Sequence, residues 1–171
     1  SMTVTAIISG GQTGADIGGL RAATELGIST GGFMPKGCRT EAGPKPEYEE
    51  LYGLMEHESP DYEKRTLSNV KLADATVIFG RRSRGSNLTE NLCHSLRKPC
   101  AWVLWIPEET ISFSPTIQSN GTYTIPSNLP QILRLWLARN KVKVLNCAGN
   151  RESKNPGIEQ LTKNYLLEAL K

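Results

Sequence analysis

The sequence predicts a doubly wound α/β fold, in which helices cover both faces of a mostly parallel sheet. Three observations carry this prediction. Short apolar runs alternate with helix-like patterns along the 171 residues, no repeat or long linker interrupts them, and a hydrophobic content of 38% is enough for one ordinary core. We therefore expect a single domain over residues 1–171, with its ligand crevice at the carboxyl ends of the strands.

The first predicted unit is a strand, a glycine turn and a helix. Val4 and residues 6–8 form an apolar run typical of a strand buried on both faces of a parallel sheet. Apolar positions from Ile17 to Leu26 then recur at near-helical spacing, and Gly27 stands where a left-handed residue would end the helix. The turn between them reads Ser9-Gly10-Gly11-Gln12-Thr13-Gly14-Ala15-Asp16.

The later elements follow in the same alternation. Capping residues or a first-turn proline mark the starts of further helices, at Ser59-Pro60, about Asn87, Ser127 and Asn155-Pro156. Apolar runs predict further strands, at 75–79, 101–106 and 142–145. Two stretches rich in turn formers interrupt the pattern. We expect residues 31–46 to form an ordered binding loop, and residues 107–126 to form an insertion or hairpin that serves as a lid, an oligomer contact or a decoration.

The glycine turn after the first strand suits anion binding. Gly10, Gly11 and Gly14 allow positive φ and close approach, and the free N–H groups at the start of a helix favour phosphate or carboxylate. The glycine spacing differs from the dinucleotide fingerprint, and no Gly-Lys-Ser or Gly-Lys-Thr follows as in a Walker A loop. The alternative is a tight strand-to-helix turn without a ligand. We expect a site for a phosphorylated small molecule.

Charge and composition exclude several classes of partner. The formal net charge of +3 is too small, and the basic residues too scattered, for a nucleic-acid-binding protein. No apolar run approaches membrane-spanning length and no secretory segment is apparent, so we expect a cytoplasmic protein without a membrane partner. The four cysteines lack the spacing of a zinc site or a disulfide framework. Basic residues instead cluster just beyond predicted strands, as Lys36 with Arg39, Arg81 with Arg82 and Arg84, and Arg151 with Lys154.

Four segments spread over the chain carry a specific pattern, at 9–16, 31–37, 65–70 and 145–154. With these segments the chain resembles the circularly permuted branch of the SLOG superfamily, Rossmann-like nucleotide-binding proteins that include molybdenum cofactor carrier-like proteins. Two positions depart from the usual pattern of that branch. Asp16 is followed by Ile17 rather than by an arginine, which removes a basic contact. The turn Arg84-Gly85-Ser86 replaces Gly-Gly-Thr and adds positive charge.

The resemblance implies that these segments and the 84–89 loop converge on one crevice for a phosphate-bearing ligand. Backbone N–H groups from Gly11 to Gly14 would hold one phosphate, and the start of a second helix at Ser86 would hold another. Glu152 or Asp16 would accept hydrogen bonds from ribose hydroxyls; alternatively, Asp16 only caps its helix and Glu152 only pairs with an arginine. The expected ligand-binding residues are Gly10, Gly11, Gln12, Thr13, Gly14, Asp16, Lys36, Arg39, Arg84, Gly85, Ser86, Asn87, Thr89, Arg151, Glu152 and Ser153.

Two classes of function remain open. The first is a binding protein that holds its ligand unchanged, either as a carrier with the molybdenum cofactor or another nucleotide-like molecule as cargo, or as a sponge for a nucleotide or ADP-ribose-derived immune signal. The alternative is a phosphoribohydrolase or nucleotide phosphoester hydrolase that uses Glu90, Glu152 or Glu41. Asn91 stands where relatives often place a glutamate, and an amide has no titratable proton near neutral pH, which disfavours hydrolysis.

The expected partners are a phosphorylated small molecule and further copies of the chain. Self-association follows from the family resemblance. Its contact surface would be the apolar helix around Leu133 and Trp136, or the 107–126 stretch. Neither a metal nor a resident cofactor is predicted from the residues themselves.

Overall fold

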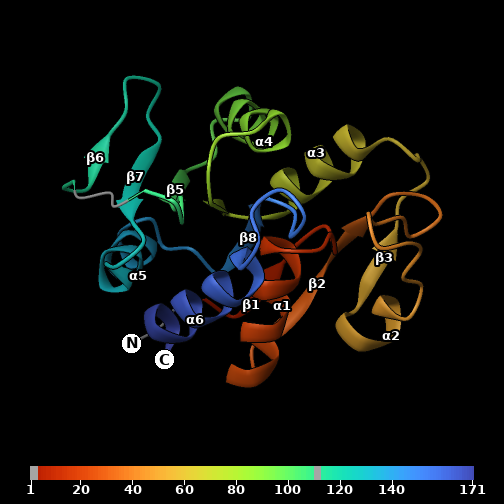
Figure 1. The fold of residues 1–171 in the computed structure, drawn as a ribbon. Helices are drawn as coiled ribbons and strands as arrows, with labels where there is room; N and C mark the ends of the chain where they lie inside the picture. Colours follow the sequence, from red (N-terminus) through yellow and green to blue (C-terminus); the bar gives the residue numbers. More distant parts are fainter. Residues whose placement is uncertain (1–3, 110–112) are drawn as a thin grey trace.

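An eight-stranded sheet between two layers of helices organises the chain in this computed structural model, which describes residues 4–109 and 113–171 (Figure 1). The strand order is β3-β2-β1-β8-β4-β5-β7-β6. Neighbouring strands pair in parallel, except that β6 and β7 are antiparallel. The strands are β1 (Ala6–Ile8), β2 (Ser29–Met34), β3 (Leu54–Glu56), β4 (Ala75–Phe79), β5 (Cys100–Leu104), β6 (Thr116–Ile117), β7 (Tyr123–Pro126) and β8 (Val144–Gly149).

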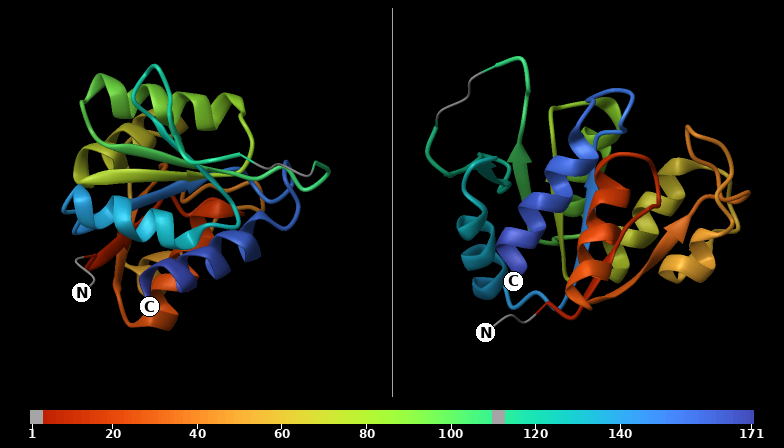
Figure 2. Two further views of the ribbon diagram at one scale, coloured as in Figure 1. Left: turned by 90° about the vertical axis from the view of Figure 1, so that its left-hand side faces the viewer. Right: turned by 60° about the horizontal axis from the view of Figure 1, so that its bottom comes forward.

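Helices cover both faces of the sheet, as Figures 1 and 2 show. Helices α1, α5 and α6 pack together on one face, and α3 and α4 pack on the other, while α2 lies beside β3. The fold is therefore the doubly wound α/β architecture that the sequence predicts. The helices are α1 (Ala15–Leu26), α2 (Tyr48–Tyr52), α3 (Tyr62–Leu72), α4 (Arg84–Ser95), α5 (Pro130–Arg139) and α6 (Ile158–Leu170).

The central strands are buried on both faces because successive side chains point to opposite sides of the sheet. In β4, Val77 and Phe79 belong to the core under α1, α5 and α6, whereas Ile78 belongs to the core under α3 and α4. All three side chains are fully buried. This two-sided burial explains why an uninterrupted apolar run, rather than an alternating pattern, marks the strand in the sequence.

The last strand of the chain lies in the middle of the sheet and creates the crevice. β8 pairs with β1 on one side and β4 on the other, so that Leu145 lies opposite both Ile7 and Ala75. From this centre the chain runs outward through β2 and β3 in one direction and through β5 and β7 in the other. Ligand crevices of open parallel sheets lie where the strand order reverses, beyond the carboxyl ends of the strands.

Several helix starts differ from the sequence predictions. Helix α3 has Asp61 rather than Ser59 as its N-cap, because the Ser59 hydroxyl accepts a hydrogen bond from the Asp61 N–H at 3.2 Å and builds a turn ahead of the helix. Helix α6 is capped by Gly157. Asn155, expected to open that helix, is fully buried and donates from its side chain to Asn150 Oδ1 at 3.0 Å. Helix α5 likewise has N-cap Leu129 instead of Ser127.

The two stretches expected to lie outside the regular alternation contain strands. β2 covers the start of the 31–46 stretch, which is therefore a loop only beyond Met34. In the 107–126 stretch, β6 and β7 form an antiparallel pair and β7 extends the sheet beside β5; residues 110–112 of this stretch lie outside the described residues.

The apolar stripe of α5 belongs to the core. Leu133 is fully buried and the partly buried Trp136 packs against the same cluster, so both side chains contribute to the core. In the parts of the chain that the structure describes, no helix has the length and apolar character needed to cross a membrane.

Candidate functional site

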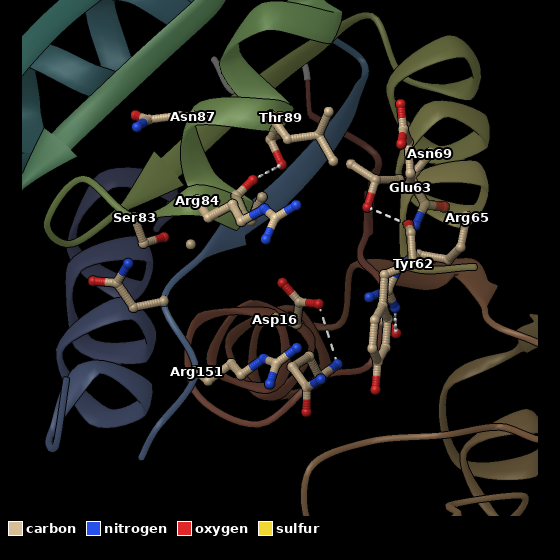
Figure 3. A pocket seen from close by; sticks show the side chains of 18 of the residues that line it. Asp16, Tyr62, Glu63, Arg65, Asn69, Ser83, Arg84, Asn87, Thr89 and Arg151 are labelled. Atoms are coloured by element: carbon tan, nitrogen blue, oxygen red, sulfur yellow. Dashed lines mark hydrogen bonds between the residues drawn. The ribbon is translucent and has the colours of Figure 1, made fainter. Parts of the chain in front are cut away.

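A cavity of about 930 Å³ lies at the carboxyl ends of β1, β8 and β4 (Figure 3). The turn after β1 and the first turn of α1 form one wall, and the segment that follows β8 joins it. Helices α3 and α4 contribute the opposite side through Tyr62, Thr66 and the first turns of α4. The reversal of strand order thus places segments from both ends of the sequence around one space.

The start of α4 offers free hydrogen-bond donors to this cavity. Ser83 caps the helix, and its hydroxyl accepts a hydrogen bond from the Ser86 N–H at 3.1 Å. Within the described ranges, the N–H groups of Arg84 and Gly85 have no acceptor. A side chain placed on Gly85 would meet nothing within 4 Å, which shows that the backbone here borders open space. A helix terminus with free N–H groups favours an anion.

Three cations at the cavity have no salt-bridge partner among the described residues. Arg84, Arg151 and Lys154 line it, and none of them forms an ion pair with any described residue. Figure 3 shows the Arg84 and Arg151 guanidinium groups directed from opposite sides toward the middle of the cavity. Arg81, which also lines the cavity, instead pairs with Glu108 at 2.5 Å. Guanidinium groups bind phosphate through two parallel hydrogen bonds, so this arrangement is suited to an anionic ligand.

The glycine turn after β1 satisfies its own N–H groups. The Gly11 N–H donates to Ser9 Oγ at 3.3 Å, the Gln12 N–H to Asp16 Oδ2 at 3.1 Å, and the Thr13 N–H to Gln12 Oε1 at 3.0 Å. These three N–H groups therefore already have acceptors within the turn. The Asp16 carboxylate accepts from the turn N–H of Gln12, where the phosphate of a ligand was expected to accept.

The turn glycines are needed for close packing. Gly11 has φ 72°, and a Cβ there would lie 2.8 Å from Leu54 Cδ1. Gly14 has φ 83°, and a Cβ there would lie 2.3 Å from the carbonyl oxygen of Asn150. The glycine pattern therefore reflects contacts of the turn with β3 and with the segment after β8 rather than an approach by a ligand.

Asp16 is a buried carboxylate in the wall of the cavity. Only 9% of the residue is exposed, and burial raises its pKa from the ordinary 3.8 to about 6. The neighbouring Arg65 and the hydrogen bond from the Gln12 N–H oppose this rise. Arg65 is itself 6% exposed and donates to the carbonyl oxygen of Gly10. A buried carboxylate with a shifted pKa in a cavity wall is a frequent feature of functional sites.

Asn150 joins the two loops that carry the cationic side chains. Its Oδ1 accepts from the Arg81 N–H at 2.8 Å, and its Nδ2 donates to the Arg81 carbonyl at 2.9 Å and to Ser86 Oγ at 3.3 Å. The residue is 3% exposed. These bonds fix the β4–α4 loop against the end of β8, and Ser86, expected to contact the ligand, does not line the cavity.

Tyr62 lies among three guanidinium groups at the other side of the cavity. The central carbons of Arg39, Arg65 and Arg151 lie 5.0, 5.2 and 5.3 Å from the centre of its ring. An aromatic face attracts cations, so the Tyr62 ring favours the presence of these three like charges near one another. Tyr62 thus helps to maintain the positive character of the site.

Comparison with known proteins identifies the family of the chain. The family model described as "Circularly permutated YpsA SLOG family" matches residues 7–170. The chain belongs to this family. Among solved structures, the chain is similar to a "Putative molybdenum carrier protein" from Syntrophus aciditrophicus, with 33% identity, a TM-score of 0.80, and coverage of 99% of this chain and 96% of that one. No curated protein matches the chain.

Half of the residues predicted for the site of this SLOG-family protein line the cavity. They are Gly10, Gln12, Asp16, Arg84, Gly85, Asn87, Thr89 and Arg151. Two of these side chains are already engaged: Asn87 Oδ1 accepts from Arg82 at 2.9 Å and the Thr89 hydroxyl donates to the Gly85 carbonyl at 3.1 Å. The predicted residues that do not line it are Gly11, Thr13, Gly14, Lys36, Arg39, Ser86, Glu152 and Ser153.

The loop after β2 lies close to the site but contributes no lining residue. The Lys36 side chain is exposed, and Arg39 donates to the Pro60 carbonyl at 2.7 Å beside Tyr62. Glu41 holds this loop against the turn after β1 and the segment after β8: it accepts from the Thr13 hydroxyl and from the Ser153 hydroxyl, the latter at 2.5 Å. The role of this loop is therefore to brace the site.

Sequence reasoning missed several lining residues that need their three-dimensional neighbours to be recognised. Tyr62, Glu63 and Ser83 carried no signal as ligand contacts. Arg65, Thr66 and Asn69 lie in a segment that the family resemblance singled out, and Arg81 and Lys154 lie in the basic clusters, so these five had a signal without an assigned role. In the portions of the chain that are described, no group of His, Cys, Asp or Glu is arranged to hold a metal ion.

Proposed function

We propose that this SLOG-family protein binds a phosphorylated, nucleotide-like small molecule in the cavity and holds it without converting it. The observation that carries this proposal is the set of three unpaired cations, Arg84, Arg151 and Lys154, around a cavity that also receives two free N–H groups from α4. Buried or cavity-directed positive charge without a counter-ion favours an anion as the missing partner.

The size of the cavity agrees with such a ligand. Small-molecule sites usually enclose about 300–1,000 Å³, and this cavity measures about 930 Å³. A single inorganic phosphate would leave most of that space unfilled. A phosphate ester with a sugar, a pterin or a purine ring would occupy it.

The positions of the candidate acidic groups favour holding over hydrolysis. Glu90 is 3% exposed and binds Arg82 at 2.8 Å and the Thr122 hydroxyl at 2.7 Å, away from the cavity lining. Glu152 accepts hydrogen bonds from the N–H groups of Gly157 and Glu159 at the start of α6. Glu41 binds hydroxyl groups in the bracing loop. An acid or base that acts on a ligand must reach it, and these three carboxylates are committed elsewhere.

Two biological uses fit a protein that only holds its ligand. A carrier would transfer cargo such as the molybdenum cofactor, which is a pterin phosphate ester. The description of the similar solved structure as a molybdenum carrier protein supports this use. A sponge would retain a nucleotide second messenger or an ADP-ribose-derived signal and lower its free concentration. The exposed Arg84, which replaces a glycine of the usual family turn, adds charge and favours a ligand with more than one negative charge.

Identification of the bound molecule tests the proposal. Purified protein is denatured, and the released small molecules are analysed by mass spectrometry after a panel of nucleotides, nucleoside diphosphates and pterin phosphates has been screened by thermal shift. We expect an intact phosphorylated ligand, and a ligand at about one hundred times its Kd should stabilise the fold by about 2.7 kcal/mol. Recovery of a cleaved product, or no response to any member of the panel, would contradict the proposal.

Variants of the unpaired arginines locate the site in the same assay. Arg84→Ala and Arg151→Ala should lose most of the ligand-induced shift. Their melting temperatures without ligand should stay near that of the parent, because neither side chain forms an ion pair. Arg139→Ala, an exposed arginine at the end of α5, is the matched control and should respond like the parent. Normal responses of both cavity variants would show that the ligand binds elsewhere.

Self-association remains a separate prediction from the family resemblance. The structure describes one chain, in which Leu133 of α5 is fully buried and Trp136 is partly buried against the core. Light scattering across a range of protein concentrations measures the oligomeric state directly.

A further inference from the structure

Asp16 is the feature of the cavity that the binding of an anion does not explain. A carboxylate in a site for a phosphate repels the ligand, yet this one lies in the cavity wall and is more than nine-tenths buried. In Figure 3 it lies between the guanidinium groups of Arg84 and Arg151, with Tyr62 to one side. The groups of the surrounding elements that face it are Arg65 from α3, Arg151 and Cys147 from β8 and its following loop, and Arg84 from α4.

The hydrogen bonding of Asp16 leaves acceptor capacity toward the cavity. Two backbone N–H groups of the turn hydrogen-bond to its side chain, that of Gln12 to Oδ2 at 3.1 Å and that of Gly10. Arg65 does not approach it closely enough for an ion pair. A carboxylate accepts at about four lone-pair sites, so the two backbone donors leave capacity for a further donor on the cavity side. Buried polar groups generally find a partner.

We propose, on the basis of the function proposed above, that Asp16 accepts a hydrogen bond from a neutral O–H or N–H donor of the ligand and thereby selects which anions bind. The chemical class is a phosphate ester that carries such a donor away from the phosphate, either a sugar hydroxyl or an amino or ring N–H of a purine or pterin. The phosphate binds Arg84 and the start of α4, because the position at the glycine turn is filled by the carboxylate.

Asp16 favours ligands that carry a hydrogen-bond donor and disfavours anions that lack one. A ligand with a donor adds a hydrogen bond to a buried carboxylate, whereas a ligand without one adds no such bond and is repelled through its own charge. Burial raises the pKa of Asp16 only to about 6, so at pH 7.5 the group is mostly an ionised acceptor. Asp16→Asn keeps an oxygen for the Gln12 N–H and presents an NH₂ donor in place of the charged acceptor.

Two probes separate this role from a general effect of charge. Guanosine 5′-monophosphate contains hydroxyl and N–H donors beside its phosphate, and pyrophosphate is an anion without such groups. Isothermal titrations at pH 7.5 compare the parent with Asp16→Asn. We expect the nucleotide to bind about ten- to a hundred-fold more weakly to the variant, as for a lost charge-assisted hydrogen bond. Pyrophosphate should bind equally well or more tightly, because a negative charge has been removed.

Further arms identify the donor and control for long-range charge. The 2′,3′-dideoxy analogue lacks the vicinal hydroxyls, and inosine 5′-monophosphate lacks the exocyclic amino group. The analogue that lacks the relevant donor should bind the parent weakly and should lose little further affinity in Asp16→Asn. Asp61→Asn removes an exposed carboxylate that precedes Tyr62 and does not line the cavity, so it should leave these ratios unchanged.

The outcomes distinguish the inference from the function on which it rests. If the parent binds these anions but Asp16→Asn strengthens the nucleotide and pyrophosphate alike, or weakens both alike, Asp16 is not a donor-selecting residue while the anion site stands. Conversion of the nucleotide by the parent that stops in Asp16→Asn would also overturn the inference, since it would make the carboxylate an acid or base. If the parent binds no member of the set, the proposed function and the inference both fail.

Discussion

At the scale of single residues, Asp16 links the ligand site to the stability of the fold. Burial raises its pKa to about 6, compared with 3.8 in the unfolded chain, so the native state holds this proton more tightly between these two values. The contribution of this group to the free energy of unfolding therefore falls as the pH rises from about 4 to about 6. The ionised group destabilises the ligand-free protein at neutral pH, a cost typical of residues retained for function.

Asp16→Asn should remove this pH-dependent loss. The interval between 3.8 and about 6 corresponds to about 3 kcal/mol. We therefore expect the stability of the variant relative to the parent to increase by up to that amount between pH 4.0 and pH 7.5, measured by urea unfolding. The exposed Asp61→Asn variant is the control. An equal pH response of the two variants would show that burial of Asp16 is not the cause.

Two glycines of the site should respond to alanine in opposite ways. Gly14 has φ 83° and no room for a Cβ beside Asn150, so Gly14→Ala should lower the free energy of unfolding by more than about 1 kcal/mol. Gly85 lies in the first turn of α4 with open space around it, so Gly85→Ala should leave the fold intact or stabilise it by up to about 1 kcal/mol.

Gly85→Ala should nevertheless weaken ligand binding, because the added methyl group stands over the free N–H groups of α4. Thermal shifts with and without nucleotide separate the two effects. A Gly85→Ala protein that responds to the ligand like the parent would place the phosphate away from the start of α4.

At the scale of elements, Glu152 stabilises the start of α6 rather than acting on a ligand. Its carboxylate accepts from the Gly157 N–H at 2.7 Å and from the Glu159 N–H at 3.0 Å. Free N–H groups and the helix dipole both favour a negative charge at this position. From the sequence, Glu152 was expected to bind a ribose hydroxyl or an arginine instead.

Glu152→Ala should therefore lower stability by about 0.5–2 kcal/mol, the usual range for loss of a helix cap. Chemical unfolding measures the effect. Glu168→Ala, an exposed glutamate near the other end of α6, is the matched control and should change stability by less than about 0.5 kcal/mol. If Glu152→Ala is as stable as the control but loses ligand binding, the residue belongs to the site after all.

At the scale of the whole molecule, the distribution of charge matters more than its sum. The net charge is only +3, yet unpaired cations gather at one edge of the sheet, around the cavity. Charge that accumulates at a concave site attracts anions even when the protein as a whole is nearly neutral. The small net charge therefore gives no indication of the positive charge that gathers at the cavity.

Ligand affinity should fall as salt is added, because the arginine and lysine side chains at the cavity are partly exposed and open to screening. We expect pyrophosphate to bind several-fold more weakly at 0.5 M NaCl than at 0.05 M, measured by titration calorimetry. Arg84→Ala should show a shallower dependence than the parent. Affinity that does not change with salt would contradict a site based on exposed cations.

The sequence by itself determined the doubly wound architecture, the buried strand at 75–79 and the end of α1 at Gly27, where φ is 72°. These features depend on local causes: apolar runs, helical spacing and a residue that tolerates the left-handed region. Half of the site residues that it predicted line the cavity, because glycine turns and basic loops at strand ends are visible locally.

The tertiary structure decided which groups remain free to bind a ligand. Thr13 and Gly14 have the local pattern of an anion-binding turn. In the fold, however, the Thr13 hydroxyl donates to Glu41 and accepts from the Glu152 N–H, and Gly14 packs against the Asn150 carbonyl. Arg84 and Arg151 lie far apart in the sequence. They face the same cavity because β8, which precedes Arg151, pairs with β4, which precedes Arg84. Whether an N–H or a charge is free depends on long-range packing and burial, which a linear pattern does not contain.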